Sequence, residues 1–197
     1  MRDVGAVILA AGASSRFGQP KQLLSFQGES LLRRAVRSAL EAGCACVTVV
    51  AGEARDRIEI ELLGTPAVVA ENWEWQRGLG TSVRCGLRHL LGSRPEIEAV
   101  VLLVCDQPFL DAGVIAALIA RQQSSGKPIV ASSYAGTFGI PALFHHTCFE
   151  SLLALPDDSG AKMLIESRSG DVAQIEFEKG AIDIDTPDDF EQVRTER

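Results

Sequence analysis

The chain has 197 residues, of which 46% are hydrophobic, and it carries a formal net charge of −7. This length and hydrophobic content predict one domain over residues 1–197, because no linker-like stretch, charge block or repeat divides the chain. The negative net charge disfavours binding to nucleic acid or to an anionic membrane surface, since the long-range field is repulsive.

The first residues and the cysteines bear on the cellular compartment. The sequence enters an apolar, strand-like run almost at once, without a signal-peptide pattern, and no apolar run is long enough to span a bilayer, which predicts a cytoplasmic protein. The 5 cysteines show no paired spacing of the kind that binds zinc. We therefore expect reduced, mostly buried thiols.

Short apolar runs alternate with amphipathic segments along the chain. In 31–42, for example, Leu32, Ala35 and Val36 recur at helical spacing, and Gly43 ends the segment. Such alternation predicts a three-layer α/β/α fold with a mostly parallel central sheet, which binds ligands at the carboxyl ends of its strands. In chain order, the expected strands are 4–11, 46–51, 67–70, 99–105 and 129–131, and the expected helices are 31–42, 55–63, 81–91 and 114–123.

The segment 9–21, which overlaps the end of the first expected strand, is typical of a phosphate-binding loop. Gly12 and Gly18 permit backbone angles that let several N–H groups converge on one anion, while Arg16 and Lys21 add positive charges. The spacing of the glycines matches neither a Walker A loop nor a dinucleotide-binding loop. The loop therefore argues against a P-loop ATPase and against classical NAD binding.

A carboxylate follows the expected strand 99–105. Asp106 would face the same crevice as the glycine loop, where it could ligate Mg²⁺ together with the oxygens of a triphosphate. A turn or helix-capping role before Pro108 is the alternative. The phosphate-binding loop at another strand end favours the metal site.

A second acidic segment lies near the C-terminus. If 181–185 is a short strand, Asp183 and Asp185 share one of its faces, and one of them could complete the metal site, Asp185 being the better candidate. Thr186 is expected to cap a final helix, with Asp189 as the reciprocal residue of a capping box.

Five motifs occur along nearly the whole chain. They are Leu-Ala-Ala-Gly-x-Ser-x-Arg-x-Gly-x-x-Lys at 9–21, Asn72 with Gly78-Leu79-Gly80-x-Ser82, Cys-Asp-Gln-Pro at 105–108, Gly-x-Pro-x-x-Phe at 139–144, and Asp-Ile-Asp-Thr-Pro-x-Asp at 183–189. Together they resemble the nucleotidyltransferases related to molybdenum cofactor cytidylyltransferase. The resemblance implies a Rossmann-like fold of the glycosyltransferase-A type.

The resemblance also implies roles for individual residues. The segment 157–162 is similar to a family segment near the acceptor, with Asp157 in place of a Gly and Lys162 in place of an Arg, which loses the bidentate fork of the guanidinium. The implied roles are nucleotide contact for Leu9, Ala10, Ala11, Gly12, Ser14, Asn72, Gly80 and Ser82, phosphate binding and catalysis for Arg16 and Lys21, Mg²⁺ binding and catalysis for Asp106, Mg²⁺ binding also for Asp185 or Asp183, and acceptor binding for Gly139, Pro141, Gly160 and Lys162.

These residues suit the transfer of a nucleotide to a phosphate. Within the family the Ala-Ala-Gly form of the loop goes with cytidine nucleotides, so CTP is the expected donor. An oxygen of the acceptor phosphate would attack the α-phosphorus and release pyrophosphate. A phosphomonoester is already largely dianionic at neutral pH, and the reaction therefore needs no general base. Arg16, Lys21 and the metal at Asp106 would stabilise the charge on the phosphates.

Several alternatives remain open at this stage. The expected acceptor is a molybdopterin-type cofactor, and the first alternative is a sugar phosphate or an alditol phosphate. The second alternative is a maturation chaperone that delivers molybdenum cofactor to a partner molybdoenzyme without chemistry. Trp73 and Trp75 could stack on a base or a pterin ring, or they could pack at the edge of the core.

Overall fold

A computed structural model describes residues 3–14 and 17–195. One seven-stranded sheet runs through it in the order β5-β4-β1-β6-β8-β7-β9. β1, β4, β5 and β6 pair in parallel, β8 is antiparallel to both of its neighbours, and β9 is parallel to β7. The strands are β1 (Val4–Ala10), β4 (Cys46–Ala51), β5 (Val68–Glu71), β6 (Ala99–Val104), β7 (Ile129–Tyr134), β8 (Thr137–His145) and β9 (Val172–Glu176).

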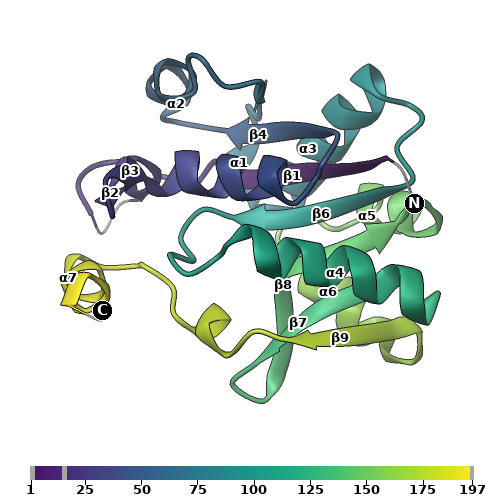
Figure 1. Ribbon diagram of the computed structural model, residues 1–197. Coiled ribbons are helices and arrows are strands. Elements are labelled where there is room, and N and C mark those ends of the chain that lie inside the picture. The colour runs from purple at the N-terminus through teal and green to yellow at the C-terminus, as the bar shows by residue number, and fades with distance from the viewer. Residues whose placement is uncertain (1–2, 15–16, 196–197) are drawn as a thin grey trace.

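Helices cover both faces of this sheet. In Figure 1, α1 and α4 lie in front of the sheet, while α3, α5 and α6 lie behind it. The front layer contains α1 (Leu31–Glu41), α2 (Arg55–Glu61) and α4 (Ala112–Ser125), and the back layer contains α3 (Leu79–Ser93), α5 (Phe149–Leu153) and α6 (Ala161–Ser167). The predicted three-layer α/β/α fold is confirmed.

The central strands are apolar along their whole length because both of their faces are covered. Within β1, Ala6 and Ile8 pack in the front core, whereas Val7 and Leu9 pack in the back core. The same burial explains why the sequence predicted these strands well. None of the described helices is long and apolar enough to cross a membrane.

The C-terminal segment packs against residues 24–31, which follow the glycine loop. Helix α7 (Pro187–Thr195) lies beside the hairpin formed by β2 (Ser25–Phe26) and β3 (Glu29–Ser30), as Figure 1 shows. A third apolar cluster joins the two regions, and Ile184 is fully buried in it. This cluster brings the acidic segment 183–185 against the glycine loop. The chain also forms the short 3-10 helices η1 (Lys21–Leu23), η2 (Trp75–Arg77), η3 (His146–Cys148), η4 (Ser169–Asp171) and η5 (Glu178–Ala181).

One predicted strand is wrong. Residues 182–185 join no sheet among the described strands, and the backbone N–H of Ile184 instead donates a hydrogen bond to the carbonyl of Asp106 at 2.9 Å. The burial of Ile184, rather than a strand ladder, holds this segment in place. The predicted capping box is confirmed, because Thr186 N–H donates to Asp189 Oδ2 at 2.7 Å and Asp189 N–H donates to Thr186 Oγ1 at 3.3 Å.

Candidate nucleotide site

The glycine loop is anchored by a buried glutamine. Gln22 is only 2% exposed, and its amide donates to the carbonyls of Ala10 at 2.7 Å and Gly12 at 3.1 Å. Its Oε1 accepts a bond from Ser14 Oγ, which in turn accepts the backbone N–H of Lys21 at 3.0 Å. These bonds fix the path of the loop on either side of the undescribed residues 15–16.

A lysine from this loop joins the two predicted metal ligands. The Lys21 ammonium lies 2.7 Å from Asp106 Oδ2 and 2.9 Å from Asp185 Oδ1. Burial alone would lower the pKa of Lys21, but the charges and hydrogen bonds of Asp106 and Asp185 outweigh it and raise that pKa. Lys21 is therefore a firmly charged cation between the two carboxylates.

A third carboxylate lies close to this cluster. Burial, followed by the negative charges of Asp106 and Asp185, raises the pKa of Asp183 to about 6. The folded protein binds this proton more tightly than the unfolded chain does, so ionised Asp183 opposes folding. Its contribution to the free energy of unfolding falls as the pH rises from 3.8 through about 6.

The variant Asp183→Asn is therefore expected to be more stable than the wild type near neutral pH. The gain in Tm, measured in EDTA so that no cation shields the cluster, should be larger at about pH 7.5 than at about pH 5. The assigned repulsion would be contradicted if the variant gained the same Tm over the wild type at both pH values. It would also be contradicted if the variant had a lower Tm than the wild type at about pH 7.5.

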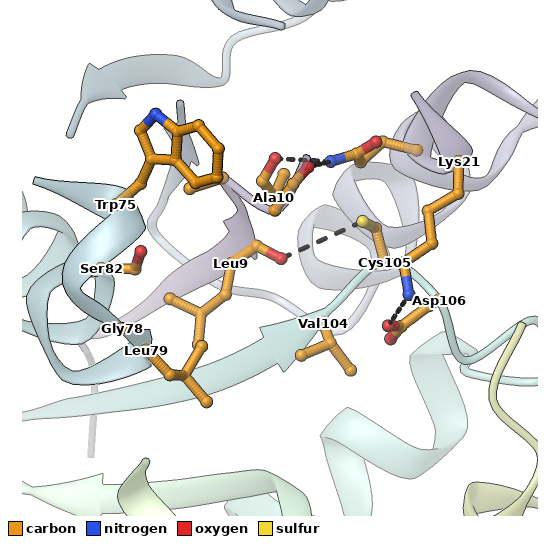
Figure 2. Close-up of a pocket in the computed structure, with 13 residues that line it drawn as sticks. Leu9, Ala10, Lys21, Trp75, Gly78, Leu79, Ser82, Val104, Cys105 and Asp106 are labelled. Atoms are coloured by element: carbon orange, nitrogen blue, oxygen red, sulfur yellow. Dashed lines mark hydrogen bonds and ion pairs between the residues drawn. The ribbon is translucent and has the colours of Figure 1, made fainter. Parts of the chain in front are cut away.

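A pocket of about 330 Å³ opens beside the charged cluster. Figure 2 shows Leu9 and Val104 on its floor, Trp75 on one side and the Lys21–Asp106 pair on the other. Of the predicted nucleotide-binding residues, Leu9, Ala10, Ala11, Gly12, Lys21 and Ser82 line this pocket, together with Gln22, Trp75, Gly78, Leu79, Val104, Cys105 and Asp106.

Three other predicted residues support the pocket from outside its lining. Ser14 closes the glycine loop as described above. Asn72 is 5% exposed and donates to the hydroxyls of Thr81 and Ser82. Gly80 is packed so closely that a Cβ atom there would lie 1.9 Å from the carbonyl oxygen of Pro156. Packing is therefore sufficient reason for glycine at position 80, and nucleotide contact by Gly80 stays a prediction.

The segment after α5 is held against the pocket by charge. Asp157 accepts from the guanidinium of Arg84 and lies 2.5 Å from Nη2 of Arg77. The hydrogen bond from Arg84 has the largest effect in lowering the pKa of the Asp157 carboxyl, and the positive charge of Arg77 lowers it further. This pairing explains the acid at position 157, where the family resemblance predicted a glycine, because a glycine could not bind either arginine.

The predicted acceptor residues are divided between two places. Gly139 and Pro141 lie on β8 beside Asp106, since the neighbouring Gln107 donates to the carbonyl of Ile140 at 3.1 Å. Gly160 begins α6 against Leu79 of the pocket. The Lys162 ammonium is half-exposed and lies 3.8 Å from Glu166 Oε1, so this lysine faces solvent rather than the pocket lining.

Two carboxylates at this site fit a hard divalent cation. Asp106 Oδ1 is buried and has no hydrogen-bond partner among the described residues, and such an oxygen suits a metal ligand. No group of three or more His, Cys, Asp or Glu side chains that could hold a metal occurs in residues 3–14 and 17–195. Mg²⁺ that is bound together with phosphates typically takes one or two carboxylates from the protein, so Asp106 and Asp185 could hold it.

The structure adds residues that sequence reasoning did not assign to the site, and it leaves one prediction outside its scope. The only signal in the sequence for a role of Gln22 at the site is its position directly after Lys21, a predicted phosphate-binding residue. Leu79 lies within the motif at 78–82 but was assigned no role of its own, and Val104 is an apolar lining residue outside any of the five motifs. Arg16, which was predicted to bind phosphate, lies outside the described residues.

Comparisons with known proteins identify the family of the chain. The model of the MobA-like NTP transferase domain matches residues 6–172. The chain is 32% identical over 200 residues to the purine catabolism protein PucB of Bacillus subtilis, covering 95% of this chain and 94% of that protein. It is 25% identical over 193 residues to molybdenum cofactor cytidylyltransferase of Escherichia coli, covering 96% of this chain and 95% of that protein.

A solved structure extends the likeness to three dimensions. Rv0371c of Mycobacterium tuberculosis H37Rv has a TM-score of 0.82 at 29% identity, over 99% of this chain and 100% of that chain. Another crystal structure of Rv0371c is a complex with manganese. The resemblance inferred from the five sequence motifs is thereby confirmed. The protein belongs to the MobA-like NTP transferase family, which is a family of nucleotidyltransferases.

Proposed function

We propose that the protein transfers CMP from CTP to a phosphate-bearing acceptor, a molybdopterin-type cofactor, and releases pyrophosphate. The observation that carries this proposal is the contact of Lys21 with Asp106 and Asp185 at one end of the pocket. We expect a triphosphate bound along the glycine loop to end beside this cation and these two carboxylates.

The pocket suits a nucleoside at its other end. Leu9, Val104 and Leu79 supply apolar surface, and the indole of Trp75 lies on the side of the pocket opposite the charged cluster (Figure 2). A nucleoside has apolar faces and polar edges, and these match a lining that combines apolar side chains with a few polar groups. We therefore expect the base to bind near Trp75 and the phosphates near Lys21.

The chain's own residues would perform the transfer by positioning and by charge. An oxygen of the dianionic acceptor phosphate attacks the α-phosphorus, the P–O bond to the β-phosphate breaks, and pyrophosphate leaves with the electron pair. Lys21 stabilises the charge on the phosphates once it turns away from the carboxylates. Asp106 and Asp185 would hold Mg²⁺, which when bound neutralises phosphate charge.

Two features support cytidine and a molybdopterin-type acceptor. The loop reads Ala10-Ala11-Gly12, the form expected with cytidine nucleotides, and a relative that matches nearly the whole chain is the cytidylyltransferase of Escherichia coli. We expect Gly139 and Pro141, on the strand next to Asp106, and Gly160, beside Leu79, to contact the acceptor.

A measurement of pyrophosphate release tests this proposal. The enzyme is incubated with Mg²⁺, each of the four nucleoside triphosphates, and either molybdenum cofactor or a panel of sugar and alditol phosphates. Release with CTP and molybdenum cofactor is the expected result. Turnover with a sugar or alditol phosphate would replace the acceptor, and tight nucleotide binding without any turnover would favour the non-catalytic chaperone.

A further inference from the structure

The side chain of Asn72, which follows β5, has an amide orientation that the backbone fixes. Its Oδ1 accepts the backbone N–H of Glu74 at 3.0 Å, and a backbone N–H can only donate. The oxygen of the amide must therefore face Glu74, and the nitrogen must face the opposite way. That nitrogen donates to Thr81 Oγ1 at 2.9 Å and to Ser82 Oγ at 3.0 Å.

The two hydroxyls differ in what they do with their own protons. Thr81 accepts from Asn72 and donates to the carbonyl of Gly78 at 2.8 Å, so its hydrogen bonds are complete within the protein. Ser82 also accepts from Asn72, but its proton finds no acceptor among the residues that the structure describes. The Ser82 hydroxyl can therefore still donate one hydrogen bond to a ligand.

The Ser82 hydroxyl faces the pocket. Its side chain projects from α3 below Trp75 and across from Leu9 (Figure 2), and the residue is only 4% exposed. A donor at such a buried position is costly to leave unpaired, because its desolvation is then not offset. A ligand that offers an acceptor there gains affinity over one that does not.

We propose that Asn72 is a positioning residue that fixes Ser82 as a hydrogen-bond donor to an oxygen of the bound nucleoside. The acceptor is either a carbonyl oxygen of the base or a hydroxyl oxygen of the ribose, since either would be presented to this wall of the pocket. The inference rests on the proposed function, in which the pocket binds a nucleoside triphosphate. It assigns to Asn72 an indirect role, through the direction of a proton.

Reversing the direction of that proton provides the test. In Asn72→Asp, one carboxylate oxygen still accepts from Glu74, and the other can only accept. Because the Thr81 hydroxyl already donates to the carbonyl of Gly78, we expect this oxygen to take the Ser82 proton and turn it away from the ligand. Calorimetric titration with CTP and Mg²⁺ should show an affinity about fivefold to tenfold weaker for Ser82→Ala, and at least as large a loss for Asn72→Asp. The double variant should bind CTP no more weakly than Asn72→Asp alone.

Thr81→Val is the matched control. It removes the other hydroxyl that accepts from Asn72, but Thr81 is not among the residues that line the pocket. We expect this variant to lose thermal stability while its affinity for CTP stays within about twofold of the wild type. In steady-state kinetics, Ser82→Ala and Asn72→Asp should raise KM for CTP more than they lower kcat, which general misfolding would not do.

Two analogues identify the oxygen that accepts the proton. If the ribose 2′-hydroxyl is the acceptor, Ser82→Ala and the wild type should bind 2′-deoxy-CTP equally. If the base carbonyl is the acceptor, the difference should disappear with 2-thio-CTP, because a thiocarbonyl is a weaker acceptor. If the wild type binds CTP and Ser82→Ala binds it equally well, the inference is overturned and the proposed function stands. If the wild type binds no nucleoside triphosphate, the proposed function fails and the inference fails with it.

Discussion

Asp106→Asn is expected to lower kcat for nucleotidyl transfer by on the order of a hundredfold or more. The carboxylate follows the central strand β6, holds Lys21 at 2.7 Å, and keeps a buried oxygen without a partner among the described residues. An amide has the same shape but carries no charge to bind a cation. The measurement is the steady-state rate of pyrophosphate release at saturating CTP and Mg²⁺.

Asp111→Asn is a matched control for this variant. Asp111 lies in the same loop and caps α4 by accepting the backbone N–H of Val114 at 3.0 Å, which an asparagine does equally well. The control should keep the wild-type rate and Tm. A rate for Asp106→Asn within a few-fold of the wild type, with CTP and Mg²⁺ saturating, would mean that Asp106 holds no catalytic cation.

Lys21→Met is expected to lower kcat by a similar factor, because the phosphates lose a cation that the glycine loop delivers. The same variant should bind Mn²⁺ more tightly than the wild type in the absence of nucleotide. In the free protein the Lys21 ammonium neutralises Asp106 and Asp185, and a divalent cation must displace it. Electron paramagnetic resonance of free Mn²⁺ measures the affinity directly.

Stability provides a second readout for the lysine variant. Without metal, Lys21→Met leaves two carboxylates facing each other, so its Tm in EDTA should fall, and Mn²⁺ should restore it. Lys127→Met is the control, because that exposed ammonium donates to the carbonyl of Gly170, whose segment contributes nothing to the pocket lining. Unchanged affinity for Mn²⁺ in Lys21→Met would show that lysine and metal do not compete.

The parts of the fold that the sequence predicted are those with strong apolar periodicity. The strands 46–51 and 99–105 match β4 and β6 to within a residue, because both of their faces are buried and the apolar run is continuous. Strand β8 was not predicted, since Gly139 and Pro141 interrupt its apolar pattern. That residues 1–197 form one domain stays a prediction.

The positions of strand ends in the sequence predicted one carboxylate of the charged cluster for the right reason, and the other for the wrong reason. Asp106 was placed near the glycine loop because the carboxyl ends of parallel strands share one edge of the sheet, and its contact with Lys21 confirms that placement. Asp185 also contacts Lys21, but the burial of Ile184, rather than a strand, holds it there. Contacts of that kind depend on side-chain packing, which periodicity does not reveal.

The residues whose side chains bind other protein groups at the site were the hardest to predict from the sequence. Gln22 and Asn72 are polar, buried and bonded to groups far along the chain or around a turn, so nothing in local sequence gives their orientation. Asn72 was predicted to contact the nucleotide, whereas the structure places it outside the pocket lining and against the hydroxyl of Ser82. The motif thus located Asn72 near the pocket, but it did not reveal which groups the side chain binds.

The transfer of the α-phosphorus of CTP tests the central claim most directly. The enzyme is incubated with molybdenum cofactor, Mg²⁺ and CTP that carries ³²P either at the α-phosphate or at the γ-phosphate. We predict that the α-label enters the cofactor product and that the γ-label appears only in pyrophosphate. Label from the γ-phosphate in the product, or no label from the α-phosphate, would contradict nucleotidyl transfer to this acceptor.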